Sequence, residues 1–79
     1  MPTVLRTGPY RFFFFSNEGT EPPHVHVESS GGYAKLWLDV AELVEVIGYG
    51  ASDIRRIRLT VIEHRRLLMG RWHEHFGSS

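Results

Sequence analysis

Two histidines separated by one valine are the residues of this sequence best suited to chemistry. His24 and His26 lie in a stretch that alternates polar and apolar residues, which predicts a β-strand with both imidazoles on one face. Imidazoles titrate near neutral pH, so one of them can accept a proton while the other donates one. The pair is therefore a candidate acid and base for phosphodiester cleavage, with a neighbouring lysine to stabilise the anion.

A second alternating stretch, residues 33–38, supplies the groups expected around the histidines. The Ser-Ser-Gly-Gly sequence between the two stretches is typical of a hairpin connection, so the two strands should pair. We predict an exposed patch on the polar face of this hairpin, with catalytic residues His24, His26 and Lys35. The binding residues predicted around them are Glu28, Tyr33 and Trp37.

The sequence is also consistent with other roles for the same side chains. As metal ligands, His24 and His26 supply two nitrogens, to which Glu28 or Glu21 could add an oxygen, whereas catalytic zinc generally has three protein ligands and no third histidine is close by. As structural groups, they would hydrogen-bond a loop or an oligomer interface beside Pro22-Pro23. Tyr33 and Trp37 are suited either to stacking on RNA bases or to cross-strand aromatic packing. No cofactor is predicted.

Short strands followed by a helix must position these residues. The pattern of residues from about 2 to 47 indicates four or five strands with short links, which predicts an antiparallel meander. Within them, residues 40–47 fit a fifth strand or a short helix, and we favour the strand. Apolar residues then recur at helical spacing from Ser52, a suitable N-cap, so one long helix over about 53–76, with any kink near Gly70, should cover the aliphatic face of the sheet.

The charged residues of this helix are mostly basic. Residues 1–45 carry three basic and six acidic side chains, whereas residues 46–79 carry six basic and three acidic ones. Most of these arginines are expected on a solvated helix face. Arg65, however, lies near the centre of the apolar stripe, where its stem can pack while its charged end pairs with an acidic residue of the sheet or binds a phosphate.

Length and composition narrow the class of protein. The 79 residues allow one small core, and 42% hydrophobic with 23% charged residues is globular usage, so we expect an α+β fold in a single domain, residues 1–79. The absence of cysteine excludes disulfide scaffolds and thiol nucleophiles. A formal charge of +0 argues against non-specific binding to duplex DNA. No segment resembles a membrane span or a signal peptide, and a cytoplasmic location is expected.

A run of four phenylalanines suggests self-association. Alternation along a strand sends Phe12 and Phe14 to one face, and Phe13 and Phe15 to the other. A chain this small has few residues with which to bury both faces. We therefore expect a homodimer or a small protein partner.

Several segments together resemble a known family of small bacterial proteins, called domain of unknown function 4160. They are Pro2–Phe15, Ser16–Glu18, Glu21–Val27, Lys35–Leu38 and Trp72–Gly77, of which Glu-Pro-Pro-His-Val-His is the most specific. The resemblance implies a bacterial or phage origin, a compact α+β domain and a small partner gene nearby. It also implies a toxin–antitoxin component, which we expect to be an RNA-cleaving or RNA-binding effector or, alternatively, a non-catalytic protein-interaction module such as the neutralising partner. It supplies no catalytic residues.

Overall fold

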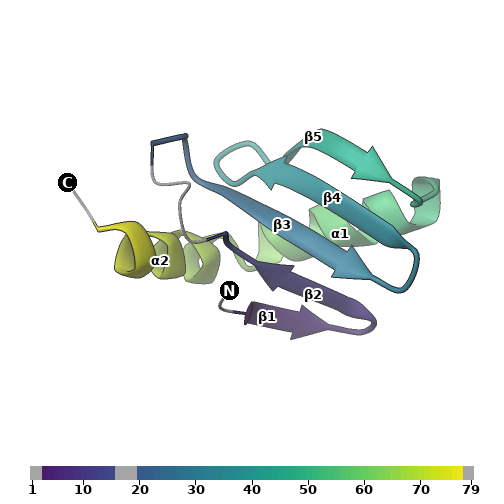
Figure 1. The fold of residues 1–79 in the computed structure, drawn as a ribbon, viewed down its shortest axis with the longest axis horizontal. Coiled ribbons are helices and arrows are strands. Elements are labelled where there is room, and N and C mark those ends of the chain that lie inside the picture. Colours follow the sequence, from purple (N-terminus) through teal and green to yellow (C-terminus); the bar gives the residue numbers. More distant parts are fainter. Residues whose placement is uncertain (1–2, 16–19, 78–79) are drawn as a thin grey trace.

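Five strands follow one another along the chain and pair in the same order, each antiparallel to the next (Figure 1). The computed structural model describes residues 3–15 and 20–77. Its strands are β1 (Thr3–Thr7), β2 (Tyr10–Phe13), β3 (His24–Ser29), β4 (Gly32–Trp37) and β5 (Glu42–Ile47). The predicted α+β meander is confirmed, and the ambiguous residues 40–47 form a strand from Glu42 onward.

Two helices follow the sheet, where the sequence predicted one. They are α1 (Ala51–Glu63) and α2 (Arg65–Phe76), so the prediction of one long helix is wrong. The break lies at His64, not near Gly70, and the backbone at His64 departs from helical geometry, with φ −109° and ψ 20°. The Nδ1 atom of His64 lies 3.0 Å from the carbonyl oxygen of Thr60, which also accepts the His64 backbone N–H. Among the described residues, no helix is long and apolar enough to cross a membrane.

Helix α1 begins earlier than the sequence predicted. Gly50 occupies the N-cap position in an extended conformation, so Ser52 lies inside the first turn and is not the cap. Asp53, also in the first turn, accepts a hydrogen bond from the Tyr10 hydroxyl of β2. This bond to a carboxylate and the burial of the phenol raise the pKa of Tyr10. The same contact fixes the start of α1 to the sheet.

The hydrophobic core lies between the helices and one face of the sheet. The strand side chains that face the helices alternate with those that face away, as the pleat requires. The core residues are Tyr10, Phe12, Phe14, Val25, Val27, Ala34, Leu36, Leu38, Ala41, Ile57, Val61, Leu68 and Trp72. Of the predicted helix stripe, Ile57, Val61, Leu68 and Trp72 pack with the aliphatic face of β3 and β4, whereas Ile54, also predicted, lies outside the core cluster.

Two arginines seven residues apart tie the helices to the connection between β4 and β5. Arg58 donates from Nε to the carbonyl oxygen of Ala41 at 3.2 Å, and Arg65 donates in the same way to Leu38 at 3.1 Å. Arg65 is half-buried, so its stem packs as predicted. The group that Nε meets is a backbone carbonyl, however, and not the acidic side chain that the sequence suggested.

Candidate functional site

The hairpin of β3 and β4 brings most of the predicted site residues together. Its register places His24 opposite Trp37, His26 opposite Lys35 and Glu28 opposite Tyr33. Because side chains alternate between the faces, these six residues share the face that points away from the core cluster. The two imidazole rings lie edge to face, with 5.0 Å between their centroids.

Both imidazoles are buried, so the prediction of an exposed patch is wrong. The exposed fraction is 0% for His24 and 2% for His26. Aromatic rings from other elements provide the cover. Phe13 stacks on the His26 ring at 5.5 Å, and Phe15 lies edge-on to it at 4.4 Å. Trp72 of α2 reaches His24, the first residue of β3, with 5.0 Å between the ring centroids.

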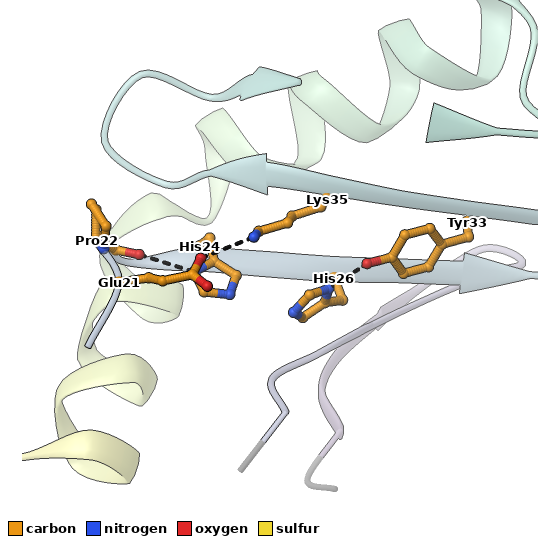
Figure 2. Close-up of polar contacts among 6 residues, drawn as sticks. All are labelled: Glu21, Pro22, His24, His26, Tyr33 and Lys35. Carbon is orange, nitrogen blue, oxygen red and sulfur yellow. Dashed lines mark hydrogen bonds and ion pairs between the residues drawn. The ribbon is translucent and has the colours of Figure 1, made fainter. Parts of the chain in front are cut away.

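Each imidazole makes a polar contact within the chain (Figure 2). The Nδ1 atom of His24 lies 2.9 Å from the carbonyl oxygen of Pro22. A carbonyl can only accept, so this Nδ1 carries the proton that is donated. The Nδ1 atom of His26 lies 2.7 Å from the hydroxyl oxygen of Tyr33. Buried polar groups need such partners, and these contacts stabilise the two rings where they are.

Lys35 is directed toward Glu21, which the sequence offered only as an alternative metal ligand. Its Nζ atom lies 2.9 Å from Oε1 of Glu21, and the same oxygen lies 3.8 Å from Nδ1 of His24 (Figure 2). The Leu38 backbone N–H donates to the carbonyl oxygen of Pro23, which places the Pro-Pro segment beside the end of β4. The two prolines between Glu21 and His24 were the available signal, because they force an extended approach to the strand.

Glu28 lies on the predicted face but its carboxylate is engaged elsewhere. It pairs with Arg11 of β2 at 3.2 Å. Arg65, the other predicted binding residue, points to the end of β4 and lies outside the histidine cluster. Trp37 does belong to the cluster, since its ring lies edge-on to His24 at 5.7 Å and 5.2 Å from the Lys35 Nζ.

The phenylalanine run divides between the two faces as predicted, but with a different consequence. Phe13 is only 2% exposed within one chain, since it packs on His26 and lies under the Arg11 guanidinium at 4.3 Å. Its burial requires no second subunit. The argument for a dimer from this strand therefore does not hold, although self-association itself remains a prediction.

Within residues 3–15 and 20–77, no three His, Cys, Asp or Glu side chains are grouped so that they could hold a metal ion. The cluster instead forms a second layer, polar and aromatic, on the side of the sheet opposite the core. Its histidines and Phe13 are buried, and its other members keep part of their surface exposed. We name it the histidine layer: Phe13, Phe15, His24, His26, Tyr33, Lys35 and Trp37.

This geometry defines a small α+β protein with a five-stranded meander, two helices on one face and buried histidines on the other. A family model described as domain of unknown function (DUF4160) matches residues 10–73, and the chain belongs to that family. No curated protein and no solved structure shows a significant match to it.

The hydrogen bond between Tyr33 and His26 gives a direct test of the histidine layer. Tyr33→Phe keeps the ring but removes the hydroxyl that meets the His26 Nδ1 atom. We expect the free energy of unfolding to fall by about 1–2 kcal/mol, because a buried nitrogen loses its partner. Urea denaturation measures the change. Tyr49→Phe, which removes a hydroxyl contact to Ser29, is the matched control and should cost less, since that contact joins two hydroxyls outside the layer.

Proposed function

We propose that this protein acts by binding another protein and not by catalysis, as the non-catalytic member of a toxin–antitoxin pair. The pairing rests on the family resemblance. The absence of catalysis rests on the burial of His24 and His26. A general acid or base must come within hydrogen-bond reach of the group with which it exchanges a proton. A phosphodiester could approach these imidazoles only if the surrounding aromatic rings moved.

The contacts of the three predicted catalytic groups support the same proposal. His24 donates to the Pro22 carbonyl, His26 meets the Tyr33 hydroxyl, and Lys35 pairs with Glu21. Lysine that is already neutralised by a carboxylate at 2.9 Å is poorly suited to stabilise a second anion. The groups therefore serve the stability of the β3–β4 hairpin.

Exposed apolar side chains provide surface for a protein partner. Large hydrophobic residues with more than a third of their surface exposed occur on β5 and just before it, on α1 and on α2. They are Val40, Val44, Val46, Ile47, Leu59, Ile62 and Leu67. Contiguous exposed apolar residues are typical of interaction surfaces, and three of these residues, Val44, Val46 and Ile47, lie within four positions of one another on β5.

An RNA-binding effector is the second candidate. The observation in its favour is that Tyr33, Lys35 and Trp37 keep part of their surface exposed on the open face of the sheet. Aromatic rings beside a cation on a sheet are suited to stacking with unpaired bases. This candidate needs no access to the buried imidazoles, whereas RNA cleavage by them does.

A growth assay separates the two proposals. Expression of the chain alone should leave bacterial growth unchanged, and the product of the neighbouring gene should co-purify with the tagged chain. Growth arrest by the chain alone would contradict the binding proposal. Lys35→Met then tests catalysis or RNA contact, because it removes the cation without opening the histidine layer. Relief of the arrest by this variant, while circular dichroism shows that it is still folded, would favour the effector.

A further inference from the structure

Strand β5 leaves one edge of the sheet open and apolar. It pairs with β4 on one side, and it is the last strand in the sheet order. Val44 is 45% exposed and Ile47 is 61% exposed. The register with β4 shifts between Glu45 and Leu43, so Val44 lies at a bulge. An exposed apolar edge strand tends to associate with another chain unless another element covers it.

Helix α1 presents a groove on the side nearest this edge. The groove is lined by Ala51, Ile54, Arg55, Arg58, Leu59 and Ile62. Arg58 reaches the Ala41 carbonyl, just before β5, whereas Asp53 on the opposite side of the helix reaches Tyr10 of β2. The groove, whose lining residues all belong to α1, therefore lies on the side of the helix nearer the β4–β5 connection, and α1 runs behind β3 and β4 in Figure 1.

The strand and the groove carry opposite charges. Glu42 and Glu45 are the exposed acidic residues of β5, and Arg55 and Arg58 are the basic residues of the groove. Among the described residues, no ion pair includes any of these four side chains. Within one chain, the two glutamates point away from α1, because they lie opposite Trp37 and Lys35.

A two-fold arrangement of two copies would satisfy both surfaces. In this arrangement the two β5 edges face each other, and the helices of the two copies lie on opposite sides of the assembly. The helix layer of one copy is then beside the sheet of the other. The outward-pointing glutamates of each β5 then face the arginines of the other copy's groove. Direct pairing of β5 with a second β5 would instead place four glutamates on one face, where like charges repel.

We propose that the protein is a homodimer in which the edge of β5 in each copy packs against the α1 groove of the other. Such an interface is isologous, so each contact occurs twice. It would cover Val44 and Val46 with Ile54 and Ile62, and it would pair Glu45 with Arg55. This proposal does not depend on the proposed function, but it covers part of the same apolar surface, so another protein would contact the residues left exposed, Val40 and Leu67.

Sedimentation equilibrium of the full chain over a wide concentration range tests the dimer. The wild type should approach twice the chain mass of 9.1 kDa. Glu45→Arg and Arg55→Glu should each raise the dissociation constant about tenfold or more, because each sets like charges against each other. The double variant should recover to within roughly threefold of the wild type. Glu63→Arg makes the same charge change on the other side of α1 and should have no effect.

Three results would overturn the proposal. The first is a monomer at every concentration, with or without binding of another protein at this surface. The second is a dimer that neither charge reversal weakens. The third is tighter association of Glu45→Arg together with unchanged Arg55→Glu, which would indicate β5 paired with β5. All three positions are exposed, so each variant is expected to fold. Circular dichroism of each variant checks that it does.

Discussion

Replacing His24 by alanine should lower the free energy of unfolding by roughly 2–4 kcal/mol, as large-to-small substitutions at fully buried positions do. The side chain is 0% exposed and contacts the rings of His26, Trp37 and Trp72. Its loss leaves a cavity and removes the donor to the Pro22 carbonyl. In a domain of this size the melting temperature should fall by about 10 °C or more.

The control for this variant is His73→Ala, since His73 is exposed on α2 and should tolerate the change. Calorimetry or thermal circular dichroism gives the melting temperatures of both variants. An unchanged melting temperature for His24→Ala would mean that the histidine layer contributes little to stability. The burial of His24 would then need another explanation, and catalysis after a rearrangement would become the better hypothesis.

Leu36→Ala should destabilise the protein by roughly 2–5 kcal/mol, the range for leucine truncation in a packed core. Leu36 is fully buried on β4, between β3 and β5, on the face covered by the helices. Small domains have total stabilities of only about 5–15 kcal/mol, so this single change removes a large fraction. Urea denaturation should show an earlier midpoint with an unchanged slope.

Leu67→Ala is the matched control, because it makes the same truncation on α2 at a residue that keeps 39% of its surface exposed. Leu67→Ala should lower the free energy of unfolding by well under half as much as Leu36→Ala. Equal losses for the two leucines would contradict the placement of the core between the helices and this face of the sheet.

The two predictions concern opposite faces of the same sheet. Leu36 belongs to the aliphatic core, and His24 belongs to the histidine layer. A chain of 79 residues without disulfides has little apolar area to bury on one face alone. Burial of aromatic rings such as Phe13 on the second face adds to that area, which gives the histidine layer a structural role.

Local periodicity was sufficient to predict much of the fold. The two alternating stretches, 24–28 and 33–38, correctly predicted a hairpin and the residues on each of its faces, because strand alternation depends only on neighbouring residues. The helical spacing of the apolar residues from Ile54 to Trp72 likewise predicted the stripe that meets the sheet, although Ile54 itself lies outside the core. The break at His64 escaped this reasoning, since the apolar spacing continues across it.

Local periodicity could not predict whether the site is exposed. Whether His24 and His26 are exposed depends on rings contributed by other elements: Phe13 and Phe15 from the end of β2, and Trp72 from α2, 48 positions after His24 in the sequence. The pairing of Lys35 with Glu21 instead of Glu28 depends on where the Pro-Pro segment meets the end of β4. Alternation assigns a side chain to a face of the sheet, but only the packing of distant segments decides whether that face is covered.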